Sequence, residues 1–333
     1  MITSIRVPTT IPPHPLFNVE PIAGKELGAV ANKPIKKGDL VISERPLFLF
    51  DAPFSAFLFS RSADLDPEEN SSFSALDRHI GRAIDQLMEF KSAQDKQCLM
   101  DLANTHPELP STYGVFKTNA VCTRLSQGGL FPHLSRVNSS CRPNLSRPQW
   151  DRSRGLIETW ALRDIELGEE LGWMYLDNSF RTSEERQEET LRVLGFKCGC
   201  PGCTLCPLER GLSDDRVLRL RELSQMLPSP PLSSSSSSSS TSAGPLDDSE
   251  EVNGSIGRET YDQIQTIKQM LPLASMEGMY DLVNELNERL RVLSLTWGGP
   301  RGMGRLEWVG EVFGDLGSEL TGSNGGLSCR CCI

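Results

Sequence analysis

The sequence predicts an α+β fold in which short strands come first and most helices follow. Three observations support this prediction. Apolar residues between positions 17 and 50 form short runs separated by glycine turns, as is typical of short strands. Apolar residues after positions 72 and 213 recur at helical spacing. Four cysteines lie between positions 198 and 206, which indicates a small loop that binds a metal ion.

Length and composition limit the possible functions. The 333 residues suffice for about two domains with a buried core. A formal net charge of -10 argues against non-specific binding of nucleic acid, which needs clustered Lys and Arg. It is compatible with a basic partner protein, although solubility alone also explains it. There is no apolar run of about 20 residues and no secretory signal pattern, so we expect no membrane segment and reduced cysteines.

The first third of the chain should contain strands followed by a helical insert. Residues 1–16 are rich in proline and are expected to be an extended lead-in. Residues 51–112 are expected to be largely helical. The first helix should follow the capping residues Ser71 and Ser72, and the second should end near Pro107 and Pro110. The apolar residues that predict the first of these helices are Phe73, Leu76, Ile80, Ile84, Leu87 and Met88.

The middle of the chain alternates between strand and helix patterns. Gly155 to Leu162 and Leu171 to Leu176 are predicted strands. Thr182 and Glu185 have the spacing of a capping box, which predicts a helix that begins there and ends at Gly195.

The last third should contain more helix and two segments of biased composition. Residues 207–228 are predicted to form a helix, and residues 229–256 a Ser-rich disordered linker. Residues 257–296 are predicted to form a helical hairpin broken at Pro272. Residues 297–333 are a Gly-rich tail.

The cysteine cluster is the clearest sign of a metal site. A structural zinc ion takes four thiolate or imidazole ligands in a tetrahedron. Cys198, Cys200 and Cys203 supply three thiolates on a loop bent by Gly and Pro. Cys206 has suitable spacing for the fourth ligand.

The ten residues from Ser135 to Asn144 read Ser-Arg-Val-Asn-Ser-Ser-Cys-Arg-Pro-Asn, and Gly168 to Tyr175 reads Gly-Glu-Glu-Leu-Gly-Trp-Met-Tyr. Singly, each could be a turn. In this order, followed by the cysteine cluster, they resemble the SET domain of lysine methyltransferases. Gly24 to Ala31 resembles the start of that domain. The overall pattern resembles fungal SET proteins, and with Cys98 alone in the insert no MYND zinc finger is expected.

The resemblance implies a SET (β-clip) fold of small curved sheets with a pseudoknot, in which the strand that contains Tyr175 is threaded under the segment that contains Asn138. It implies a domain over residues 17–206, which includes the helical insert and a post-SET zinc motif at 198–206. It also implies that Cys141 is the fourth zinc ligand, so Cys141 and Cys206 are alternatives for that position.

The resemblance further implies that S-adenosyl-L-methionine is the cofactor. Glu26 and Ser139 stand where the family has glycine and histidine. Asn119 could equally be a helix cap. The residues expected to bind the cofactor are Lys25, Glu26, Asn119, Ser135, Asn138, Ser139, Tyr175 and Phe196.

Tyr175 is the expected catalytic residue, as a hydroxyl or a phenolate that orients the substrate amine. The implied activity is protein-lysine N-methylation of a histone or another basic protein by a monomer in the nucleus, the cytoplasm or both, with no direct nucleic-acid partner. The alternative is a SET-fold protein-binding module with little catalysis, which Glu26 and Ser139 motivate.

Overall fold

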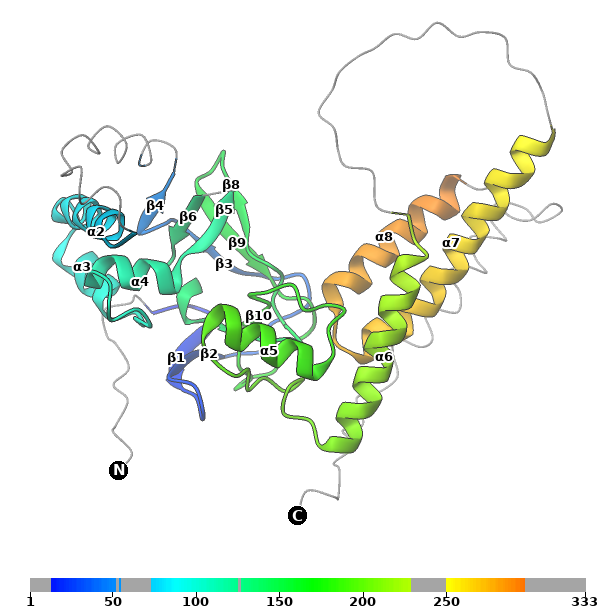
Figure 1. Cartoon of the computed structure of the whole chain (residues 1–333), viewed down its shortest axis with the longest axis horizontal. Helices are drawn as coiled ribbons and strands as arrows, with labels where there is room; N and C mark the ends of the chain where they lie inside the picture. The colour runs from blue at the N-terminus through cyan, green and yellow to red at the C-terminus, as the bar shows by residue number, and fades with distance from the viewer. Residues whose placement is uncertain (1–12, 52–53, 55–72, 125–126, 229–249, 297–333) are drawn as a thin grey trace, which may run out of the picture. The chain divides into compact units, whose positions relative to one another are not determined.

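The computed structural model describes residues 13–51, 54, 73–124, 127–228 and 250–296 (Figure 1). Most of the predicted lead-in, the capping residues Ser71 and Ser72, most of the Ser-rich linker and the Gly-rich tail therefore lie outside the described residues. The chain divides into two compact units, Met1–Asp177 and Asn178–Ile333. Within the described residues, no helix combines the length and apolar character needed to cross a membrane.

The first unit is built from small sheets, as predicted. They share a core with the fully buried residues Phe17, Phe131, Ile157 and Leu171. One sheet is the antiparallel pair β1 (Phe17–Pro21) and β2 (Leu27–Ala31). Two three-stranded sheets have the orders β3-β9-β8 and β4-β6-β5. Their strands are β3 (Leu40–Glu44), β9 (Leu156–Trp160), β8 (Gln149–Asp151), β4 (Phe48–Phe50), β6 (Gln127–Leu130) and β5 (Val121–Arg124).

Among the described residues, three helices in and directly after the predicted insert lie beside β4 and β6 in Figure 1. They are α2 (Phe73–Glu89), α3 (Ala93–Met100) and α4 (Ser111–Asn119). Their apolar faces pack in a second core with residues of β4 and β6, including Phe48, Ile84 and Leu130. A capping box of Ser92 and Asp95 starts α3.

The fourth sheet is the short parallel pair of β7 (Asn138–Ser139) and β10 (Gly172–Trp173). On the other side of the β10 segment, Leu171 N donates to Ala29 O of β2 at 2.8 Å. The segment at 169–173 thus lies between β2 and the segment at 138–145. The predicted strand 171–176 is shorter in the structure, because the pairing with β7 covers only Gly172 and Trp173.

The second unit is helical. The helix α5 (Ser183–Leu194) has the predicted capping box and ends at Gly195, whose φ of 77° is left-handed. The helices α6 (Pro207–Gln225), α7 (Glu250–Met276) and α8 (Tyr280–Thr296) run side by side in Figure 1. Their buried stripes form a third core, which includes Leu220, Ile267 and Leu290.

Two predicted boundaries in this unit were wrong. Pro272 lies inside α7, and the turn comes at Gly278, whose φ is 65°. Buried residues on both sides of Pro272, Met270 and Ala274 among them, share one core, so packing outweighs the cost of about 3 kcal/mol for an internal proline. In addition, α7 starts at Glu250 and not at residue 257.

The N-terminal edge of the first unit contains a histidine with a shifted pKa. The ring of His14 stacks on Phe17 with centroids 4.1 Å apart, and its Nδ1 accepts a hydrogen bond from Leu16 N. Burial, followed by the charges of His133 and Lys33, lowers the pKa of His14 to about 4. The unfolded chain, with a histidine pKa of about 6.5, therefore binds more protons than the folded chain between these two pH values.

We therefore expect the stabilisation from neutral His14 to be complete above about pH 6.5 and to be lost as the pH falls toward 4. Replacement His14→Phe should flatten the decline of the urea midpoint over this range, because the ring contact with Phe17 is kept and the titrating group is removed. The control is His79→Phe in α2, which should retain the wild-type decline. An unchanged decline in His14→Phe would contradict the assignment.

Candidate functional site

A network of three side chains joins the predicted cofactor loop to the central motif. Lys25 Nζ donates to both carboxylate oxygens of Glu170, at 2.8 and 2.7 Å. Glu170 Oε1 also accepts from Asn138 Nδ2 at 2.9 Å, and the same nitrogen donates to Leu27 O at 3.0 Å. The loop before β2, the strand β7 and the segment before β10 are thus tied together at one carboxylate.

These contacts determine which atom Asn138 presents to a ligand. Both hydrogens of its amide are used within the protein, so the side-chain oxygen is the group left to accept a hydrogen bond. Gly28 makes the close packing possible. A Cβ atom at position 28 would lie 2.8 Å from Asn138 Nδ2 and 3.2 Å from Glu170 Oε1. A side chain here would displace the network.

The loop that contains Glu26 does not require glycine at that position. The positive φ of this loop is at Gly24, at 74°, and Lys25 N donates to Ile22 O at 3.0 Å to close the turn. Glu26 itself is exposed. The difference from the family glycine is therefore a difference in charge and size more than in backbone strain.

The expected cofactor residues Ser139, Ser135 and Phe196 differ in their burial and hydrogen bonding. Ser139 is half-buried in β7, opposite Trp173. The hydroxyl of Ser135 donates to Phe131 O at 2.8 Å. Phe196 follows the end of α5 and is 40% exposed, which is unusual for a large apolar ring.

Asn119 is the last residue of α4, and its amide nitrogen is used by the protein. Its Nδ2 donates to Ala103 O at 2.7 Å and to Val115 O at 2.8 Å. The first bond ties the end of α4 to the loop after α3. These contacts fit the capping alternative, and they leave the amide oxygen as the atom that could meet a ligand.

Tyr175 lies two residues after β10 and contacts the central motif. Its hydroxyl donates to Val137 O at 2.6 Å, and its ring lies 4.7 Å from that of Trp173. Burial and then the negative charge of Glu170 raise the pKa of Tyr175 above its ordinary value. This shift favours a neutral phenol at neutral pH over the phenolate alternative.

Sequence reasoning missed two residues that position this site, Glu170 and Asn144. Asn144 is 3% exposed and bonds on both sides of its amide. Its Nδ2 donates to Glu170 O at 2.9 Å, and its Oδ1 accepts from Gly172 N at 2.8 Å. Both residues lie in the motifs quoted above, but a turn explained them equally well, and only long-range pairing reveals their partners.

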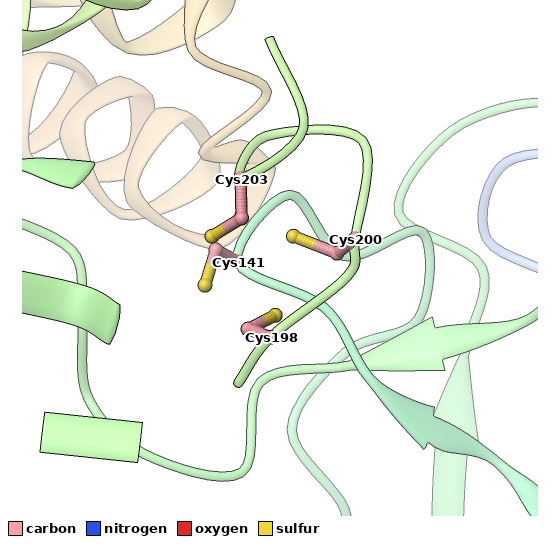
Figure 2. Close-up of side chains that lie close together, drawn as sticks. All are labelled: Cys141, Cys198, Cys200 and Cys203. Atoms are coloured by element: carbon pink, nitrogen blue, oxygen red, sulfur yellow. The ribbon is translucent and has the colours of Figure 1, made fainter. Parts of the chain in front are cut away.

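The four cysteines Cys141, Cys198, Cys200 and Cys203 gather in one place (Figure 2). All four are buried, and their sulfur atoms lie within 4.8 Å of one another. A tetrahedral zinc ion with bonds of about 2.3 Å needs sulfur atoms roughly 3.8 Å apart, so the set fits zinc. Cys206, the alternative fourth ligand, does not belong to this group and precedes α6 as its N-cap residue.

Hydrogen bonds from α5 shape the cysteine loop. Cys198 N donates to Gln187 Oε1 at 3.0 Å, and Gln187 Nε2 donates to Cys198 O at 2.7 Å. Arg186 Nη2 donates to Gly202 O at 3.1 Å. Within the loop, Cys203 N donates to Cys200 O at 2.9 Å. These bonds fix the main chain of the loop on α5.

Comparison with known proteins identifies a matching domain family. The family model for the SET domain matches residues 26–176. Histone-lysine N-methyltransferase set5 of Schizosaccharomyces pombe is 28% identical over 210 residues, which are 63% of this chain and 56% of that protein. Human histone-lysine N-methyltransferase SMYD3 is 43% identical over 75 residues, which are 22% of this chain and 17% of that protein.

A solved SET domain of LSMT, bound to lysine and AdoHcy, covers 56% of this chain and 54% of that one, with 11% identity and a TM-score of 0.32. A score this low supports no argument from superposition. The chain spans little more than half of the S. pombe relative and a smaller part of the human one. Residues 26–176 nevertheless match the SET domain, which identifies this part of the chain as a SET domain, and the relatives named above that share it are histone-lysine methyltransferases.

Proposed function

We propose that this protein transfers methyl groups from S-adenosyl-L-methionine to lysine side chains of a histone or another basic protein. The supporting observation is the pairing of β7 with β10, which joins the Asn138 segment to the one that leads to Tyr175 inside a matched SET domain. The family relatives named above are histone-lysine methyltransferases. The net charge of -10 suits a basic substrate.

The cofactor supplies the methyl group as a sulfonium. Asn138 would accept a hydrogen bond from its amino-acid or adenine end, and exposed Phe196 would be covered by it or by the substrate. Lys25, Glu26, Asn119, Ser135 and Ser139 complete the proposed binding set. In this set Lys25 would support the cofactor site through its bond to Glu170, and Ser139 would contact the cofactor through its main chain.

Lysine has a pKa of about 10.4, so the amine must lose its proton before it can attack. Neutral Tyr175 cannot take that proton at neutral pH. Its hydroxyl hydrogen is directed to Val137 O, so its oxygen lone pairs are the atoms that can accept from the substrate N–H and hold the amine in line. Most of the rate enhancement would then come from positioning.

We further propose that Cys141, Cys198, Cys200 and Cys203 bind zinc as thiolates. The SET domain is proposed to span 17–206, with the insert at 51–112 and the post-SET motif at 198–206. The helix at 207–228 and the hairpin would lie outside the catalytic part. We also propose that the protein is a monomer with a protein substrate as partner, located in the nucleus, the cytoplasm or both; the name of the S. pombe relative supports the nuclear location.

The test is labelled methyl transfer from S-adenosyl-L-methionine to purified core histones and to a cell lysate, with labelled residues identified by mass spectrometry. We expect label on lysine. If calorimetry also shows no binding of millimolar cofactor, absence of label would favour the alternative of a SET-fold binding module, which the departures at Glu26 and Ser139 motivate.

A further inference from the structure

Arg136 is a buried charge that the proposed mechanism does not yet use. It ends the short 3-10 helix η2 (Leu134–Arg136), two residues before Asn138, and is 6% exposed. Its Nη2 donates to Asp101 O at 2.7 Å. Its Nε is buried and has no hydrogen-bond partner among the described residues. A guanidinium has five N–H donors, so most of its capacity for an anion is not used.

The immediate surroundings do not supply a strong counter-charge. Burial lowers the pKa of Arg136, and negative charge on Cys98, Asp101 or Glu26 would oppose that shift. Burial also raises the pKa of the Cys98 thiol to about 11, so this neighbour is neutral at neutral pH. In the described part of the chain, no carboxylate forms an ion pair with Arg136. A buried guanidinium without a paired anion is costly.

The position of Arg136 relates it to the cofactor residues. It bonds to the main chain of Asp101, and Asn119 bonds to Ala103 in the same loop. The charge of Glu26, in the loop before β2, acts on the same guanidinium. Arg136 is thus linked to Asn119 through the loop after α3, and both Asn119 and Glu26 belong to the proposed cofactor-binding set.

We propose that Arg136 binds the carboxylate of the cofactor's amino-acid end and that Glu26 weakens this binding by repulsion. The inference rests on the proposed use of S-adenosyl-L-methionine. A carboxylate matches the fork of guanidinium donors better than any other group of this cofactor. Glu26 is exposed and stands where the family has an uncharged glycine, so this chain would bind the carboxylate in a balance between one positive and one negative side chain.

The competing explanation is that Arg136 only braces the loop after α3. The two explanations differ in their dependence on the ligand carboxylate. We therefore compare two ligands by calorimetry on the full-length protein. One is S-adenosylhomocysteine, and the other is S-adenosyl-3-thiopropylamine, which lacks only the carboxylate.

The variants are Arg136→Gln, which keeps a donor for Asp101 O, and Arg136→Lys, which keeps the charge without the fork. Arg154→Gln is the control, because Arg154 is 54% exposed on the turn before β9, where it pairs with Glu158. Arg136→Gln should lower the affinity for S-adenosylhomocysteine by roughly tenfold to a hundredfold. It should lower the affinity for S-adenosyl-3-thiopropylamine by less than about twofold. Arg136→Lys should be intermediate. Arg154→Gln should change neither.

Glu26→Gln keeps the inference testable if Arg136 variants do not fold, because Glu26 is exposed. This variant should raise the affinity for S-adenosylhomocysteine by about threefold to tenfold and leave the affinity for S-adenosyl-3-thiopropylamine unchanged. Equal losses for both ligands in Arg136→Gln, or equal wild-type affinity for both ligands, would overturn the inference alone. A wild type that binds neither ligand would overturn the proposed function together with it.

Discussion

Tyr175→Phe should lower methyl transfer by about 100-fold or more while the affinity for S-adenosylhomocysteine stays within about threefold. The hydroxyl of Tyr175 bonds to Val137 O and would be the acceptor that aligns the substrate amine. Removal of one oxygen leaves the ring contact with Trp173 in place. The measurement is single-turnover transfer of labelled methyl, with calorimetry for the product cofactor.

The pH dependence gives a second measure of the same residue. Burial and the charge of Glu170 raise the pKa of Tyr175, so its hydroxyl keeps its proton while the substrate lysine loses its own near pH about 10.4. The wild-type rate should therefore rise with pH up to that value without a falling limb from the tyrosine. Unchanged turnover in Tyr175→Phe would exclude the catalytic assignment. Tyr261→Phe, in α7, is the matched control and should have wild-type rates.

Cys200→Ser should abolish zinc binding and lower the thermal midpoint of the protein. The four buried thiols lie within 4.8 Å of one another, which is compatible with a tetrahedral ion, and a serine hydroxyl is a poor replacement for a thiolate. Metal content by plasma mass spectrometry should be close to one zinc ion per chain in the wild type and close to none in the variant. Chelation of the wild type should reproduce the lower midpoint.

Two further variants decide the fourth ligand. Cys141→Ser should behave like Cys200→Ser, because Cys141 belongs to the group of four sulfur atoms. Cys206→Ser should retain zinc and the wild-type midpoint, because Cys206 lies outside that group. If Cys206→Ser lost zinc and Cys141→Ser retained it, Cys206 would be the fourth ligand in place of Cys141. The site would be refuted if the wild-type protein contained no metal after purification and also bound none when zinc was added.

Much of the local structure follows from the sequence alone. The helix α5 begins and ends where Thr182, Glu185 and Gly195 indicate, because caps and left-handed glycine stops depend on residues within one or two helical turns. The short strands and their glycine turns follow for the same reason. The motifs around Asn138 and Tyr175 also suffice to indicate the SET domain, which the family match confirms.

Long-range contacts could be decided only by the tertiary structure. Glu170 is bound to Lys25 and Asn138, which are far from it in the chain, and no local pattern selects that carboxylate over Glu169. The neutral state of Tyr175 depends on burial and on that same carboxylate. Pro272 was misread because a helix break predicted from one residue ignores the core that α7 shares with its neighbours.

The sequence by itself therefore indicated the SET domain, the order of the elements and the set of candidate residues. The tertiary structure decided which candidates meet. It grouped Cys141 with the loop cysteines in place of Cys206, oriented the amide of Asn138 and placed Arg136 in a buried position with an unused donor. The physical reason is that hydrogen bonding and burial depend on the segments that pack against a residue, and these are distant in sequence.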